Sequence, residues 1–129
     1  MNKDTNQIMA LINAYRMDGL GNNFLIIDRR QNAFEINRNR IIDLVSKKVF
    51  IFDQLITLEK KEENEYPIKI FNPDGIEVNA CGNGARCIAY LISQENKQKK
   101  ISLKTKERVL SAEIVGEQKV KINMGKPKI

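Results

Sequence analysis

The chain has 129 residues, of which 42% are hydrophobic and 29% are charged, and its formal net charge is +6. This length suits one domain with a sizeable core, and no apolar run reaches the ~18 residues that a membrane-spanning helix needs. The chain contains no histidine and only two cysteines, which excludes Ser-His and Cys-His dyads and the paired ligands of a zinc site. Any proton transfer must therefore use thiols, carboxylates, Lys or Tyr, and no metal is expected.

The N-terminal third predicts a leader, a β-hairpin and a helix. Residues 1–8 are expected to form a flexible leader. The N-terminal stretch 1–17 is a poor signal peptide, which favours a cytoplasmic location. Apolar runs at 8–16 and 24–29 predict two strands, joined tightly through a Gly- and Asn-rich connection at 17–23. An apolar stripe within residues 38–48 predicts an amphipathic helix.

The rest of the chain predicts strands around one apolar helix. From Cys81 to about Glu95 the sequence is apolar nearly all round, which is typical of a helix surrounded by protein. Strands are predicted at 54–59 and 66–71, with a charged loop between them, and near 100–104, 108–115 and 118–124. The pattern predicts a single α+β domain spanning 1–129, in which a twisted mixed or antiparallel β-sheet wraps a central buried helix.

Residues 71–87, FNPDGIEVNACGNGARC, carry the chemistry. A polar turn and a short strand at 76–79 lead to Cys81, which lies where the helix begins. Unpaired N–H groups and the helix dipole favour a thiolate there, and such positions lower a thiol pKa from ~8.5 to roughly 3.5–7.5. The neighbouring glycines allow the backbone to approach a bound anion such as a carboxylate. The segment therefore predicts a nucleophile or base beside an anion site, although a buried, inert cysteine is the alternative.

The remaining charges and Cys87 suggest structural roles. Lys and Arg are scattered, and no nucleic-acid-binding motif is present, so the basic charge indicates a solvated surface and no nucleic-acid partner. Cys87 follows Cys81 by six residues, a spacing that puts the two off a shared helix face and disfavours a disulfide. Cys87 is expected to pack in the core.

Four segments resemble the diaminopimelate epimerase family: MDGLGNNFLIID near the start, FDQL at 52–55, the 71–87 motif, and INMGKP near the end. Members of that family are about twice this length and have two similar α+β halves facing a cleft. The resemblance implies the N-terminal half only, without the C-terminal catalytic domain. It also implies cofactor-independent conversion of LL- to meso-diaminopimelate, in lysine and peptidoglycan biosynthesis, by two cysteines that act on opposite faces of the α-carbon.

The resemblance implies one catalytic residue, Cys81, and a set of substrate-binding positions: Asn22, Gln54, Asn72, Gly82 and Asn83. Amide side chains suit an amino acid because they pair with both of its charged ends without adding net charge. Structural alternatives stand beside these roles. Asn22 tolerates a left-handed turn, Asn72 before a proline is a turn-former, and Gln54 opens a strand where it is solvated. Arg86 and Tyr90 are expected to be structural.

The chain departs from the family pattern at three places. Asp18 replaces the family's histidine, and Asn23 replaces an aspartate. Val49-Phe50-Ile51 replaces a glycine-rich approach to Gln54, which predicts a different path for that loop because Phe and Ile do not adopt positive φ without strain.

Three interpretations cover the missing half. In the first, which we favour, the chain is one part of a split or shortened epimerase that is inactive until a separate C-terminal half completes it. In the second, a homodimer places Cys81 of two copies on one substrate. In the third, the domain is non-catalytic and acts as a binding or assembly module.

Overall fold

The computed structural model describes residues 14–19, 21–31, 35–46, 51–79, 82–116 and 119–123. Within them the elements follow in this order: β1 (Ala14–Gly19), β2 (Asn22–Asp28), α2 (Arg38–Ser46), β3 (Gln54–Leu58), β4 (Tyr66–Phe71), β5 (Glu77–Val78), α3 (Gly82–Asn96), β6 (Lys100–Lys104), β7 (Val109–Gly116) and β8 (Lys119–Asn123).

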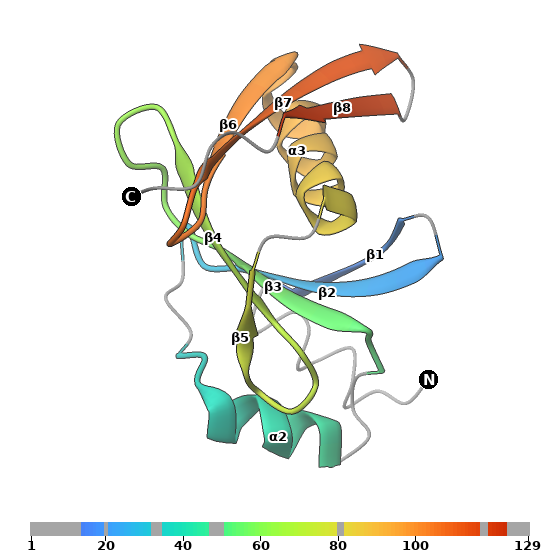
Figure 1. Cartoon of the computed structure of the whole chain (residues 1–129), viewed down its shortest axis with the longest axis vertical. Helices are drawn as coiled ribbons and strands as arrows, with labels where there is room; N and C mark the ends of the chain where they lie inside the picture. Colours follow the sequence, from blue (N-terminus) through green and yellow to red (C-terminus); the bar gives the residue numbers. More distant parts are fainter. Residues whose placement is uncertain are drawn as a thin grey trace.

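The described strands form one curled, mixed sheet. Its order is β1-β2-β3-β4-β6-β7-β8, and β5 pairs with β4 outside this path. The β2–β3 and β4–β6 pairs are parallel, whereas the other pairs are antiparallel. The sheet curls around α3, and α2 lies on the opposite side of it (Figure 1). The predicted α+β fold with a wrapped central helix is confirmed.

Two apolar cores lie on the two faces of the sheet. Successive residues of a strand point to opposite faces, so β2 sends Phe24 and Ile26 toward α3 but Leu25 and Ile27 toward α2. All four are at most 1% exposed. On its buried side α3 contributes Ala85, Cys87, Ile88, Ala89 and Ile92. A sheet covered on both faces explains why the β2 and β3 sequences are nearly continuous apolar runs.

The structure corrects some predicted boundaries. Most of the 17–23 connection is strand, because β1 extends to Gly19, which pairs with Asn22. Gly21 has φ +89°, and no atom of the described residues would contact a Cβ there, so its role is conformational. Helix α3 is less enclosed than predicted, since Gln94, Glu95 and Asn96 are exposed. The proposed leader at 1–8, the start of the first predicted strand and residues 47–50 lie outside the described residues.

An arginine fixes the C-terminal end of α3. The Arg30 guanidinium donates to both carboxylate oxygens of Asp28, at 2.9 and 2.7 Å, and to both of Glu95, at 2.8 and 2.7 Å. These hydrogen bonds, with Asp28 contributing most, hold the pKa of Arg30 well above its ordinary value. Because Glu95 belongs to α3 and Arg30 follows β2, the cluster ties this end of the helix to the sheet.

No described helix has the length and apolar character needed to cross a membrane.

Candidate active site

The sheet brings three predicted site residues to one of its edges. Asn22 begins β2, and Gln54 begins β3, which is parallel to β2 with Phe24 paired to Gln54. Strand β4 is antiparallel to β3 with Leu55 paired to Phe71, so Asn72 emerges beside Gln54. Register alone therefore gathers Asn22, Gln54 and Asn72, although they are spread over 51 positions of the sequence.

Gln54 and Asn72 form an amide pair. The Gln54 Nε2 donates to Asn72 Oδ1 at 3.4 Å, and both residues are half-buried. Among the described residues, each amide keeps the other half of its hydrogen-bonding capacity: an acceptor oxygen on Gln54 and a donor nitrogen on Asn72. The alternative interpretation was a Gln54 that opens a strand and is only solvated. Gln54 does open β3, but it is half-buried and bonded to Asn72.

Asn72 is also a turn-former, as the alternative interpretation held. Gly75 donates its N–H to the Asn72 carbonyl at 2.9 Å, and Asn72 donates to the Ile76 carbonyl at 3.0 Å. Gly75 has φ +82°, and an added Cβ would lie 2.8 Å from the Arg38 carbonyl oxygen, so α2 abuts the turn. The backbone of Asn72 thus builds the turn while its side chain faces Gln54.

Asn22 lies in regular strand. Among the described non-glycine residues, only Glu63 and Lys97 have positive φ, so the left-handed alternative for Asn22 is wrong. Its neighbour Asn23 makes a reciprocal pair with Asp53. Asn23 N–H donates to Asp53 Oδ2 at 2.7 Å, and Asp53 N–H donates to the Asn23 carbonyl at 2.9 Å.

This reciprocal pair was not predicted from the sequence. It joins the starts of β2 and β3 and places Gln54 in register even though the approaching loop lacks the family's glycines. Of that loop, Ile51 is 77% exposed, and Val49 and Phe50 lie outside the described residues.

The first turn of α3 packs directly on the same part of the sheet. A Cβ on Gly84 would lie 2.7 Å from Ile56 Cδ1 and 3.4 Å from Phe24 Cε1, so no side chain fits there without displacement. Ile56 and Phe24 each lie two residues after a predicted site residue. Gly82 and Asn83, both half-buried, therefore begin the helix over the edge where Gln54 and Asn22 lie. Cys81, the predicted catalytic residue, lies outside the described residues.

Arg86 connects this turn to the last strand. Its Nη1 donates to Asn83 Oδ1 at 3.0 Å, and its Nε donates to the Val120 carbonyl of β8 at 3.2 Å. Arg86 thus has the structural contacts expected of it. Cys87 is 6% exposed and belongs to the core around α3, as predicted.

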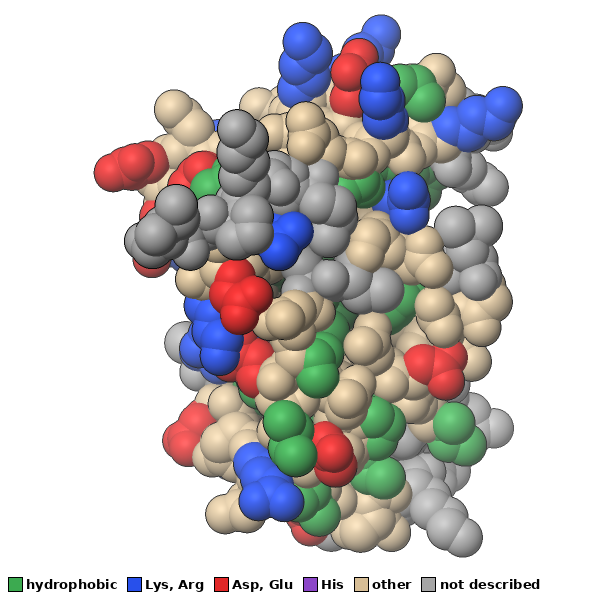
Figure 2. Space-filling view, viewed as in Figure 1, with side chains coloured by type: hydrophobic (Ala, Val, Ile, Leu, Met, Phe, Trp, Pro, Cys, Tyr) green, Lys and Arg blue, Asp and Glu red, His purple; other side chains and the backbone are tan. Residues whose placement is uncertain are grey.

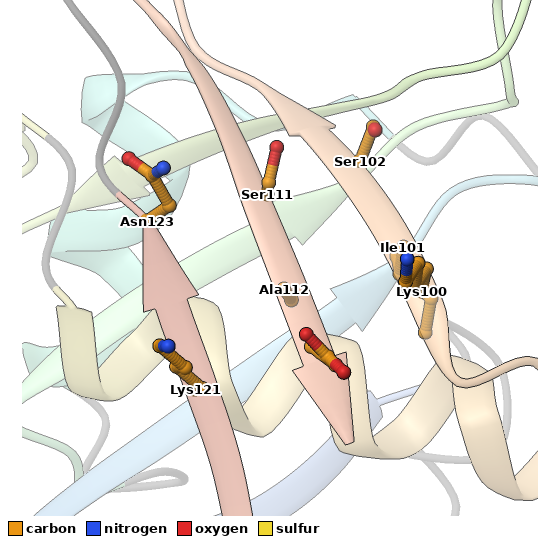
Figure 3. Close-up of a pocket in the computed structure, with 8 residues that line it drawn as sticks. Lys100, Ile101, Ser102, Ser111, Ala112, Lys121 and Asn123 are labelled. Carbon is orange, nitrogen blue, oxygen red and sulfur yellow. The ribbon is translucent and has the colours of Figure 1, made fainter. Parts of the chain in front are cut away.

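Among the described residues, a second hollow lies away from the predicted site. A groove of about 400 Å³ lies over β6, β7 and β8 (Figure 3), and none of the predicted site residues lines it. On the face seen in Figure 2, acidic side chains lie among the basic ones, so this face has no continuous basic stripe of the kind that binds nucleic acid. Within the described ranges, no three His, Cys, Asp or Glu residues are grouped to hold a metal ion.

Comparison with known proteins identifies relatives of this chain. Residues 14–129 match the family model described as diaminopimelate epimerase. A diaminopimelate epimerase of Pelagibacter ubique is 41% identical over 118 residues, which is 92% of this chain and 43% of that protein. One from Coxiella burnetii is 35% identical over 122 residues, or 91% of this chain and 44% of that protein. The chain therefore spans less than half the length of these curated relatives.

Solved structures show the same fold. A putative phenazine biosynthesis protein from Clostridium difficile has a TM-score of 0.61 at 21% identity, and the match covers 80% of this chain and 40% of that one. A predicted epimerase from Pseudomonas aeruginosa has a TM-score of 0.58 at 16% identity, covering 80% and 39%.

Proposed function

This chain belongs to the diaminopimelate epimerase family, and we propose that it supplies one half of a two-base epimerase site. Cys81 is the base on one face of the substrate α-carbon. Asn22, Gln54, Asn72, Gly82 and Asn83 bind the charged groups of diaminopimelate. A cytoplasmic location follows from the same proposal.

The observation that carries the proposal is the amide pair beside the start of α3. Gln54 and Asn72 are joined at 3.4 Å on a sheet edge over which the first turn of α3 lies. Between them they offer an acceptor for an ammonium group and a donor for a carboxylate, as an amino-acid substrate requires.

The reaction requires three contributions from these residues. The Cys81 thiolate takes the α-proton, leaving an electron pair on carbon that conjugates with the carboxylate. Unpaired N–H groups in the first turn of α3 stabilise the negative charge that develops on that carboxylate. The amide pair fixes the rest of the substrate, so that the α-carbon stays within reach of the thiolate.

Inversion needs a second proton donor on the opposite face, because one group cannot reach both faces of a held carbanion. Within the described residues, the other cysteine, Cys87, is buried in the core and cannot play that part. We infer that the second base lies outside residues 1–129, and that these residues alone do not invert the substrate.

The test is conversion of LL- to meso-diaminopimelate in D2O, with deuterium measured at the inverted α-carbon. The chain is assayed alone and with a C-terminal half of a relative that has been shown to be folded. We expect inversion with deuterium incorporation only in the mixture, its complete loss in Cys81→Ala, and its retention in the matched variant Cys87→Ala.

Two outcomes would contradict the proposal. Inversion by the chain alone would indicate a second copy as the source of the other thiol. No exchange in either case would indicate a non-catalytic module.

A further inference from the structure

We propose that Arg86 is a positioning residue that fixes the orientation of the Asn83 side chain, so that the start of α3 presents hydrogen-bond donors to a carboxylate. The inference rests on the proposed function for the identity of the ligand. The contacts from which it is drawn are those of Arg86 itself.

The first step is the chemistry of the Arg86–Asn83 bond. A guanidinium has donors only, so the atom of Asn83 that lies 3.0 Å from Nη1 must be the oxygen. The amide nitrogen of Asn83 is thereby turned away from Arg86. In the part of the chain that the structure describes, no hydrogen bond engages that nitrogen. Its two N–H groups remain for a ligand.

The second step is that Arg86 is itself held. Its Nε donates to the Val120 carbonyl at 3.2 Å, so the guanidinium spans from α3 to β8. A Cβ on Gly82 would lie 3.4 Å from Nη1, which places the guanidinium against the first residue of the helix. A lysine could not make both bonds in the same way, because its donors lie on a single nitrogen whereas the guanidinium uses two separate nitrogens, Nε and Nη1.

The third step concerns charge. The ion pairs among the described residues involve Arg29 and Arg30, and none involves Arg86. Both partners of Arg86 are neutral oxygens. Its positive charge therefore adds to that of the helix N-terminus, which favours an anionic group at the same place.

Taken together, these steps assign two effects to one side chain. Arg86 orients the Asn83 donors, and it contributes charge. Only the first effect passes through Asn83, so a double-mutant cycle separates the two.

The experiment compares the rates at which iodoacetate and iodoacetamide alkylate Cys81, which directly precedes Gly82, with mass spectrometry to confirm the modified residue. The two reagents differ in that one carries a carboxylate, so the ratio of their rates reports carboxylate recognition. We expect Arg86→Gln to lower that ratio about fivefold in the full chain, within the range that a charge near a helix N-terminus produces. In an Asn83→Ala background, Arg86→Gln should lower it less than twofold.

Two further variants keep the test decisive. Lys60→Gln removes one positive charge beyond the far end of β3 and should leave the ratio unchanged. Arg86→Lys keeps the charge and should give a ratio between those of the wild type and Arg86→Gln. If the glutamine variant does not fold, the lysine variant still tests the inference, because its ratio should be lower than that of the wild type.

Several outcomes would overturn the inference. The first is a wild-type chain that shows no preference for iodoacetate. The second is an Arg86→Gln change that lowers the rate ratio equally in the wild-type and Asn83→Ala backgrounds. The third is an Arg86→Lys variant whose rate ratio equals that of the wild type. Failure of the proposed function is distinguishable, because the chain would then show no deuterium exchange with any partner while the alkylation ratio still depended on Arg86 through Asn83.

Discussion

The two ends of α3 are each held by an arginine, but in different ways. At the C-terminal end, Arg30 makes four hydrogen bonds of 2.7–2.9 Å to the carboxylates of Asp28 and Glu95. At the N-terminal end, Arg86 makes two bonds of 3.0 and 3.2 Å, both to neutral oxygens. Charge-assisted bidentate bonds are stronger than bonds to neutral acceptors, so the first end is the more firmly fixed.

The difference shows how one helix serves both structure and chemistry. The charge of Arg30 is neutralised by its partners, so it contributes to the position of the helix and leaves nothing for a ligand. The charge of Arg86 has no such partner among the described residues. The end proposed to bind substrate is thus held by packing and weaker bonds, and its donors are kept available.

The packing at the N-terminal end gives the largest expected effect. Gly84→Val should lower the free energy of unfolding by about 3 kcal/mol, because even a Cβ would lie 2.7 Å from the buried Ile56. Urea titration followed by circular dichroism measures the change. The control is Gly116→Ala, where the described neighbour of a Cβ is Lys119 at ordinary contact distances, and the change should stay within about 0.5 kcal/mol.

A loss below about 1 kcal/mol in Gly84→Val would show that Ile56 and Phe24 move aside easily. The N-terminal end would then be held by Arg86 and not by packing.

The second-largest expected effect comes from removing the Arg30 hydrogen bonds at the C-terminal end of α3. Arg30→Met should cost about 2 kcal/mol, since it leaves the Asp28 carboxylate, 8% exposed, without its main partner. The cost is smaller than for a wholly buried pair because the Glu95 side chain is 41% exposed. Thermal or urea unfolding measures it, and Arg29→Met, which loses one contact to Glu59 at 3.2 Å, is the control.

The pH dependence of the Arg30→Met effect follows from its raised pKa. A group whose pKa is raised on folding contributes its stability fully at any pH below its unfolded value. The difference between wild type and Arg30→Met should therefore stay constant from about pH 7 to pH 10. A difference that disappears within that window would show that Arg30 is not the charge that matters.

Much of the fold could be predicted from local pattern. The apolar stripe of 38–48 and the apolar run after Cys81 gave α2 and α3, and the 66–71 strand was predicted at its observed bounds. The hairpin through 17–23 was predicted correctly, but the strand bounds beside it were wrong. Gly and Asn favour turns in isolation, but pairing of Asp18 with Asn23 and of Gly19 with Asn22 extends both strands.

The contacts that position the candidate site were beyond sequence reasoning. Asn23–Asp53, Arg86–Val120 and Arg30–Glu95 join residues that are 30, 34 and 65 positions apart. Such pairs depend on strand register and on how the sheet curls, which neither spacing nor propensity encodes. The family resemblance implied Gln54 and Asn72 as binding residues, but the 3.4 Å bond between them follows from register.

The smallest expected effect tests whether the sheet edge beneath α3 is held as lightly as its N-terminal end. Asp53→Ala removes the acceptor that lies 2.7 Å from the Asn23 N–H, and it should cost about 1 kcal/mol because Asp53 is exposed. Asp53→Asn keeps an oxygen acceptor without the charge and should recover about half of that loss. Urea titration of both variants beside Glu62→Ala, an exposed carboxylate whose described hydrogen bonds use its backbone, separates this bond from a general charge effect. Equal losses in the alanine and asparagine variants would show that the charge of Asp53, and not its bond to Asn23, stabilises the start of β3. A loss as large as that of Arg30→Met would remove the contrast between the two ends, because the site edge would then be as firmly fixed as the end that Arg30 holds.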